Sequence, residues 1–313
     1  MEIGCLGIWV MRTTICILLS TFNGENYLQP QLESIFNQEN ITYKLIVRDD
    51  GSVDNTDRIL NDYQARGLLT WYKGSNIGPA LSFMDLLYHA PEYDFYAFCD
   101  QDDIWLPNKL NAAITRLLNE SCGDSPALYI SDTILVDKNL RRIKQKKDRH
   151  LFTFEASLLR NPATGCTMVI NNRLKTLICG FRPSFVSMHD SWAYRVCLAC
   201  GGSVIYDNES YILYRQHGEN VLGGKKHFIR RWKNRIKRLF VREFKGERLK
   251  TAENLLNGYR AYLNENNYKT LHILTHYQES LKNKMWLCWN KNMKTATLSG
   301  KLMFIVSILT NKY

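Results

Sequence analysis

The fold is decided by a stretch near the N-terminus, ICILLSTFNGENYLQPQLESIF, which covers residues 15–36. Five apolar residues at its start are typical of a buried strand; a Ser-Thr-Phe-Asn-Gly turn follows, and then apolar residues recur at helical spacing. Strand-like apolar runs continue at 44–48, 69–72 and 95–99, separated by helical patterns around 56–63 and 80–90. This alternation predicts a parallel sheet with helices on both faces, in which ligands bind beyond the carboxyl ends of the strands.

Composition and charge limit the class of protein. The chain has 313 residues, of which 45% are apolar and 12% aromatic, so it can bury a core and is not wholly disordered. Residues 221–313 contain 20 Lys and Arg against 5 Asp and Glu, whereas the preceding part is slightly acidic. We therefore predict an α/β domain at 11–223 and a basic, mostly helical region at 224–313. Beyond residue 110 we expect strands at 127–130 and 166–170 and a helix at 190–200.

Polar and acidic side chains follow three of the predicted strands. The loops are Ser20 to Gly24, Asp49-Asp50-Gly51-Ser52 and Asp100-Gln101-Asp102-Asp103. Because the carboxyl ends of parallel strands meet at one edge, these loops should border one crevice. The crowded carboxylates of Asp100, Asp102 and Asp103 favour a hard divalent cation such as Mg²⁺, which prefers carboxylate and phosphate oxygens. A solvated acidic turn or a helix cap is the alternative.

Taken together, the motifs resemble a known family. The segments ILLSTFNGENYL at 17–28, VRDDGS at 47–52, NIG at 76–78 and DQDDIW at 100–105 are similar to glycosyltransferase family 2, the inverting nucleotide-sugar enzymes of the GT-A fold. NPATGCTM at 161–168, MHDSW at 188–192 and YRQHGENV at 214–221 resemble its bacterial rhamnosyltransferase-like branch. We therefore expect the GT-A α/β class, a Rossmann-like, mostly parallel sheet flanked by helices, with a basic helical C-terminal appendage.

The resemblance implies roles for individual residues. Asp190 matches the catalytic base of the family, and for its neighbour His189 a direct and a structural role both stay open. The nucleotide-sugar-binding positions are matched by Thr21, Asn23, Gly24, Asp49, Asp50, Asn76, Asp100, Arg215 and His217, the last two as contacts of the donor diphosphate. The metal motif is matched by Asp100, Asp102 and Asp103, with Asp102 the direct ligand of Mg²⁺ or Mn²⁺. Ser191 departs from the family, because many relatives carry a second tryptophan there, and this bears on acceptor contacts.

The activity implied by the resemblance is inverting, metal-dependent transfer of a sugar to a saccharide acceptor in bacterial surface polysaccharide assembly, such as O-antigen or capsule. Rhamnose from dTDP-rhamnose is the preferred donor sugar, and a UDP-hexose or UDP-N-acetylhexosamine is the alternative within the class. A non-catalytic nucleotide-sugar or glycan-binding protein is the alternative outside it, and the presence of Asp190 favours the enzyme.

The basic C-terminal region suggests where the protein works. Apolar residues recur at three- and four-residue spacing among Lys and Arg, which predicts a basic amphipathic helix at 227–244. Such a helix suits an anionic membrane surface, where the lipid-linked acceptors implied by the resemblance would be reached; packing on the protein body is the alternative. The acidic body disfavours nucleic acid as a partner.

The cysteines and the N-terminus favour a cytoplasmic location. Nine cysteines show no disulfide-like framework, and Cys197 and Cys200 are expected to be core residues rather than a metal or redox site. Glu2 and Arg12 interrupt the pattern of a secretory leader. We therefore expect a cytoplasmic enzyme, peripheral at the inner face of the bacterial plasma membrane.

Overall fold

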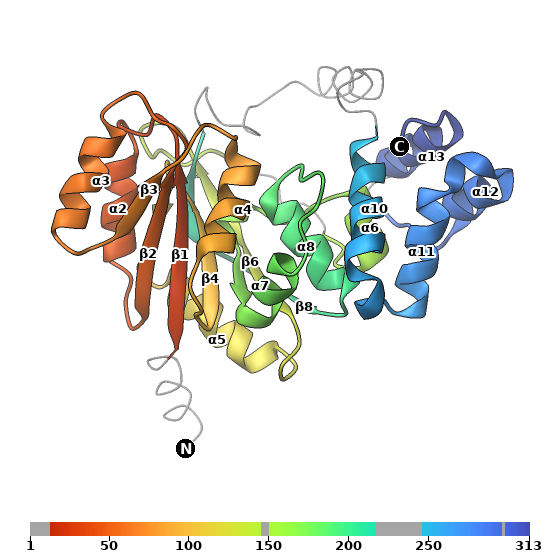
Figure 1. The fold of residues 1–313 in the computed structure, drawn as a ribbon, viewed down its shortest axis with the longest axis horizontal. Helices are drawn as coiled ribbons and strands as arrows, with labels where there is room; N and C mark the ends of the chain where they lie inside the picture. Colours follow the sequence, from red (N-terminus) through yellow and green to blue (C-terminus); the bar gives the residue numbers. More distant parts are fainter. Residues whose placement is uncertain (1–12, 145–149, 217–245, 296–297) are drawn as a thin grey trace.

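The computed structural model describes residues 13–144, 150–216, 246–295 and 298–313 (Figure 1). The basic helix predicted at 227–244 lies outside these residues, and so does His217.

A mixed sheet forms the centre of this part of the chain, with the strand order β3-β2-β1-β4-β7-β6-β8-β5. The first four strands in this order are parallel to one another, and β6 is parallel to β8. β7 runs antiparallel between β4 and β6, and β5 runs antiparallel to β8. The strands are β1 (Thr14–Thr21), β2 (Thr42–Asp49), β3 (Thr70–Lys73), β4 (Phe95–Asp100), β5 (Ile104–Trp105), β6 (Ala127–Val136), β7 (Val169–Asn171) and β8 (Ser203–Arg215).

Helices cover both faces of the sheet, which explains the unbroken apolar run of β1 (Figure 1). Successive side chains of a strand point to opposite faces, so Ile15, Ile17 and Leu19 enter one core while Cys16 and Leu18 enter the other. The first core is completed by α2 (Leu28–Phe36), α3 (Thr56–Ala65) and α5 (Lys109–Glu120), and the second by α4 (Pro79–His89), α7 (Asn172–Cys179) and α8 (His189–Ala199).

Among the C-terminal helices, α10 packs against α8, and the others extend the molecule away from the sheet (Figure 1). They are α10 (Glu247–Tyr259), α11 (Glu265–Thr275), α12 (Leu281–Trp289) and α13 (Leu298–Leu309), and α11 contacts the short α6 (Phe154–Leu159). The rings of Trp192 on α8 and Tyr259 on α10 lie 6.0 Å apart, and the Tyr313 hydroxyl donates to the carbonyl of Leu158 at 2.7 Å. No helix within the described ranges is long and apolar enough to cross a bilayer.

Several features of the sheet differ from the prediction. β6 continues to Val136 beyond the expected 127–130, and the two-residue β5 was not expected. Residues 166–170 were expected to form one strand, but the chain makes a 3-10 turn, η1 (Gly165–Thr167), before the three-residue β7. The longest strand, β8, was not predicted, because Asp207, Asn208 and Glu209 interrupt its apolar pattern and its pairing with β6 shifts register at this point. Cys197 and Cys200 are free thiols packed in or against the second core, as expected.

Candidate active site

The predicted crevice lies at the carboxyl ends of β1, β2 and β4. The strand register places Thr21 beside Asp49 on one side and Ser20 beside Asp100 on the other. A cavity of about 990 Å³ opens at this edge. A volume of this size accommodates a ligand larger than a single sugar.

The cavity gathers most of the residues that the sequence singled out. Those that line it are Thr21, Asn23, Asp50, Asn76, Asp100, Asp102 and Asp190. Gly24, Asp49, Asp103 and Arg215 lie behind the cavity wall rather than on it. Asp190 is distant in sequence from the others, so the tertiary structure alone brings it to the acidic loop.

Asp50 is held rigidly at one end of the cavity. Its carboxylate oxygens accept hydrogen bonds from the backbone N–H groups of Ile77 at 3.0 Å and Gly78 at 2.9 Å. Arg48 donates to the same carboxylate and also to Asp85 at 3.0 Å. The arginine and Asp50 are both buried, so each charge is compensated by the other. This arrangement fixes the direction in which Asp50 faces a ligand.

The turn after β1 depends on Gln101, a residue that we did not predict. The Thr21 hydroxyl and the Phe22 N–H both donate to Gln101 Oε1, at 2.5 and 2.8 Å, and Gln101 Nε2 donates to the Phe22 carbonyl at 3.1 Å. A Cβ atom on Gly24 would lie 2.5 Å from Thr21 Oγ1 and 2.6 Å from Gln101 Oε1. Gly24 therefore supports the site by leaving room for this bond rather than by lining the cavity.

Asp49 stabilises the loop after β2 through hydrogen bonds inside the protein. It is completely buried and accepts from Ser52 N at 3.1 Å, and its second carboxylate oxygen lies 3.6 Å from Lys73 Nζ. The Ser52 hydroxyl in turn accepts from the N–H of Asn23 at 2.8 Å. Asp49 thus connects the loops after β1 and β2, and its contact with a ligand stays a prediction.

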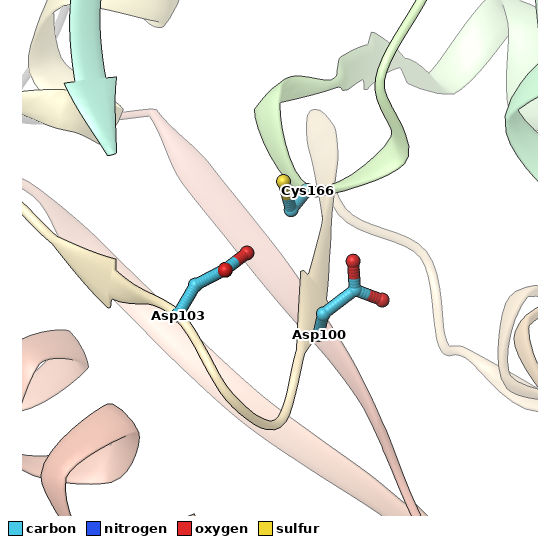
Figure 2. Close-up of side chains that lie close together, drawn as sticks. All are labelled: Asp100, Asp103 and Cys166. Carbon is cyan, nitrogen blue, oxygen red and sulfur yellow. The ribbon is translucent and has the colours of Figure 1, made fainter. Parts of the chain in front are cut away.

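The acidic loop after β4 concentrates negative charge. One donor atom each of Asp100, Asp103 and Cys166 lies within 4.8 Å of the others, and Figure 2 shows the three side chains around one point. Burial, together with the charges of Asp102 and Asp190, raises the pKa of Asp100 to about 7. Burial and the charges of Asp102 and Asp100 raise the pKa of Asp103 well above its usual range.

These donor atoms fit a hard divalent cation only in part. Asp100 and Asp102 line the cavity and supply the carboxylate oxygens that Mg²⁺ and Mn²⁺ prefer. Asp103 Oδ2 is buried, and among the described residues the hydrogen bonds to this carboxylate come only from the Arg215 N–H, on Oδ1, and the weakly donating Cys166 thiol, which is consistent with a cation nearby. The soft Cys166 thiol is buried beneath them, and burial raises its pKa well above the usual range, so it is a poor ligand for such a cation.

Arg215, at the end of β8, secures the acidic loop from behind. Its backbone N–H donates to Asp103 Oδ1 at 3.2 Å, and its Nε donates to the carbonyl of Asp102 at 2.8 Å. Its Nη1 donates to the carbonyl of Lys138 at 2.8 Å. The arginine therefore positions the loop that carries Asp102. It does not line the cavity, and its contact with the donor diphosphate stays a prediction.

Asp190 lies in the first turn of α8 and faces the cavity. Its Oδ2 accepts from the N–H of Gly165 at 3.1 Å, and its Oδ1 accepts from Asn161 Nδ2 at 3.3 Å and from the N–H of Ser191. Burial raises its pKa to about 6, although these hydrogen bonds and Arg195 favour the ionised form. A carboxylate with a pKa close to neutrality is suited to accept a proton.

His189 lies beside Asp190 between two phenylalanine rings. Its imidazole centroid is 4.0 Å from the ring of Phe83 and 4.8 Å from the ring of Phe98. Burial lowers its pKa to about 3, so the ring is neutral at physiological pH. His189 also lines the cavity, and neither of its ring nitrogens has a hydrogen-bond partner among the described residues, so the direct and the structural role both stay open.

Several supporting residues were missed by the sequence analysis, for different reasons. Arg48 stands in an apolar strand directly before Asp49, and an unpaired charge in a buried strand was a signal for a buried partner. Gln101 and Asn161 carry no comparable signal, since a polar residue in a loop is common.

Comparison with known proteins extends these observations. Residues 16–178 match the model of the family described as Glycosyl transferase family 2. The dTDP-rhamnosyl transferase RfbG of Shigella flexneri is 29% identical over 238 residues, which are 69% of this chain and 77% of that protein.

Two solved structures share the fold. S. aureus TarS 1-349 in complex with UDP-GlcNAc superposes with a TM-score of 0.58 at 16% identity, over 95% of this chain and 80% of that one. The mannosyltransferase PcManGT from Pyrobaculum calidifontis, in complex with GDP-Man and Mn²⁺, gives a TM-score of 0.53 at 16% identity, over 96% of this chain and 81% of that one.

Proposed function

Because the chain belongs to glycosyltransferase family 2 and has the GT-A fold, we propose that it transfers one sugar, with inversion, from a nucleoside-diphosphate donor to a saccharide acceptor. The protein is a glycosyltransferase; the donor, the metal dependence and the stereochemistry are the proposed parts. One observation carries the proposal: Asp190 and the Asp100–Asp102 loop line the same cavity, although Asp190 lies far along the chain, beyond the matched residues 16–178. A base and a leaving-group site are thereby available to one substrate pair.

The donor nucleotide would lie between the loops after β1 and β2. Asp50 lines this end of the cavity, and a carboxylate there can accept from a nucleobase N–H or a ribose hydroxyl. Thr21, Asn23 and Asn76 line the same end and offer further hydrogen-bonding groups. The rigid hold of Arg48, Ile77 and Gly78 on Asp50 supports a role in orientation, because a preorganised acceptor loses little freedom on binding.

Asp102, with Asp100, would hold Mg²⁺ or Mn²⁺ against the donor diphosphate. When bound, such a cation supplies positive charge to the leaving nucleoside diphosphate. The protein would position the two carboxylates, and Arg215 holds the loop in place by donating a hydrogen bond to the Asp102 carbonyl. The raised pKa of Asp100 supports this role, because crowded carboxylates gain from a nearby cation.

Asp190 would act as the general base. In an inverting transfer the acceptor oxygen attacks the anomeric carbon, the bond from that carbon to the diphosphate oxygen breaks, and the acceptor proton must be removed. Asp190 is deprotonated above about pH 6 and can accept this proton. Gly165, Asn161 and Ser191 hold the carboxylate in place by donating to it.

For the donor sugar we favour rhamnose carried by dTDP. The likeness to a dTDP-rhamnosyl transferase over 77% of its length supports this choice. A UDP-hexose or UDP-N-acetylhexosamine is the second candidate, which a structural neighbour in complex with UDP-GlcNAc makes worth testing.

The donor is tested by thermal unfolding with dTDP, UDP or GDP, each with and without Mg²⁺ or Mn²⁺. A nucleotide at a hundred times its Kd stabilises the fold by about 2.7 kcal/mol, which is a shift of several degrees. A metal-dependent shift with dTDP alone supports the rhamnosyl proposal, whereas a shift with UDP alone assigns the second candidate. No shift with any nucleotide would contradict donor binding at this site.

We further propose that the acceptor is lipid-linked and belongs to bacterial surface polysaccharide assembly, such as O-antigen or capsule. The enzyme would then work in the cytoplasm at the inner face of the plasma membrane, with 11–223 as the catalytic domain and 224–313 as a basic appendage. The likeness to RfbG and the excess of Lys and Arg in residues 221–313 support this placement.

A further inference from the structure

The C-terminal helices α12 and α13 expose large apolar side chains in regular rows. Six such side chains are between 39% and 76% exposed: Leu281, Met285 and Trp289 on α12, and Leu302, Val306 and Leu309 on α13. The spacing within each helix is four residues, or four and three, so each set lies on one helical face. We refer to these two rows as the α12–α13 stripes. Single exposed apolar residues are ordinary, but rows on adjacent helices mark an interaction surface.

The stripes are separate from the faces through which α12 and α13 pack on the protein. Leu287 and Cys288 of α12 and Phe304 and Ile308 of α13 are buried, so both helices already rest on the protein through other faces. The two helices also pack against each other, and α12 contacts α11. Within the part of the chain that the structure describes, the side chains of these rows are therefore left exposed to solvent.

The charge around the stripes indicates what covers them. Between Leu281 and Tyr313 the chain has six lysines and no Asp or Glu. Lys282, Lys291 and Lys294 are exposed. A second copy of the chain would bring like charges together, whereas a surface of anionic headgroups complements them. Trp289, at 73% exposure, is the residue type most enriched where a membrane meets water.

The position of the two helices fits a surface contact that leaves the catalytic cavity open. α12 and α13 lie at the opposite end of the molecule from α2 and α3, well to the side of β1, β2 and β4 (Figure 1). Contact at this end would not cover the strand ends that border the cavity.

We propose that the α12–α13 stripes seat the protein on an anionic lipid bilayer, with Trp289 at the boundary between headgroups and acyl chains and the lysines against the headgroups. This deepens the membrane contact proposed above by assigning it to particular residues. It does not depend on which sugar is transferred, since vesicle binding is measured without substrate.

The apolar part is tested by flotation of the full chain with vesicles of phosphatidylglycerol and phosphatidylethanolamine, against phosphatidylcholine alone. The protein should float with the anionic vesicles at low salt. The triple variant L281S/M285S/W289S should need about tenfold more lipid for half-maximal binding, because it removes the exposed apolar area of α12 that would enter the bilayer. Its control is L118S/L140S, which removes exposed leucines from elsewhere on the surface and should bind like the original protein.

The role of the lysines beside the stripes is tested with a control variant that changes the net charge equally. K282E/K291E and K44E/R58E each lower the net charge by the same amount at exposed positions, the first pair beside the stripes and the second on the α/β part. Only the first should weaken binding, by about tenfold or more, since each Lys near an anionic surface contributes about fivefold and two are lost. Equal weakening by both pairs would show a general charge effect and would overturn the assignment.

Two further outcomes would overturn the proposal. Binding that survives the α12 substitutions but is lost with R230E/R231E would place the contact in the segment at 227–244. A dimer in solution that the triple variant dissolves would identify a second copy as the occupant. The nucleotide-induced thermal shift, measured on every variant, shows that the fold and donor site are intact, and it separates this test from the test of the proposed function.

Discussion

Replacement of Asp190 by asparagine tests the catalytic assignment most directly. The variant keeps the shape of the side chain and removes its ability to accept a proton. General-base assistance contributes about 10²- to 10⁴-fold, so kcat should fall by that factor, which corresponds to about 2.7–5.4 kcal/mol. The affinity for the donor nucleotide should stay within about twofold, because Asp190 lies outside the group of residues around Asp50.

The structure also predicts the effect of this substitution on stability. The amide oxygen of asparagine can still accept from Asn161 Nδ2 and the N–H of Ser191, but its NH₂ group then faces the N–H of Gly165, which now donates to Oδ2 at 3.1 Å. One buried donor loses its partner, which costs about 1–3 kcal/mol. A urea titration measures this loss of stability separately from the loss in catalysis.

The assay is release of the nucleoside diphosphate from the donor identified by thermal shift, in the presence of acceptor. Asp207→Asn is the matched control, because Asp207 is also a buried carboxylate and lies outside the cavity. Its Oδ2 accepts a hydrogen bond from the Tyr129 hydroxyl at 3.1 Å. The control variant should lose stability but keep kcat. If Asp190→Asn retains most of its kcat, or if both variants lose activity equally, Asp190 is not the base.

The remaining predictions concern pH, the β1 turn and a buried ion pair. Because burial raises the pKa of Asp190 to about 6, its base form is lost as the pH falls through that value. The value of kcat/KM should therefore be constant above about pH 7 and fall about tenfold per pH unit below pH 6. A profile that stays constant down to pH 5 would contradict this. Gly24→Ala places a Cβ 2.5 Å from Thr21 Oγ1, so it should weaken donor binding by about tenfold in the thermal-shift titration, whereas Gly67→Ala, in open space, should leave binding unchanged and cost only some stability. Arg48→Met leaves the buried Asp50 without its positively charged partner and should lower the free energy of unfolding by about 3–5 kcal/mol. The additional change Asp50→Asn should restore part of this loss. Equal stability of the single variant and the original protein would refute the pairing.

Much of the first half of the fold could be predicted because its signals are local. The β1 run, the turn at residues 20–24 and the periodic apolar residues of α2 are contiguous in sequence, and the structure confirms strand, turn and helix. The second half was harder to predict. β7 has three residues and β8 has polar residues in its middle, so both depend on neighbouring strands rather than on their own pattern.

The sequence by itself determined the family resemblance, the acidic loop after β4 and the placement of Asp190 at the start of a helix. Each of these rests on residues that are neighbours in the chain, and short-range patterns are readable without a fold. Only the tertiary structure decided which groups hold them in place. Gln101 meets Thr21 across 80 residues, and Arg215 meets Asp102 across 113. It also decided which faces of α12 and α13 stay uncovered, because exposure depends on how the helices pack on one another and on α11, and burial is a property of the assembled chain.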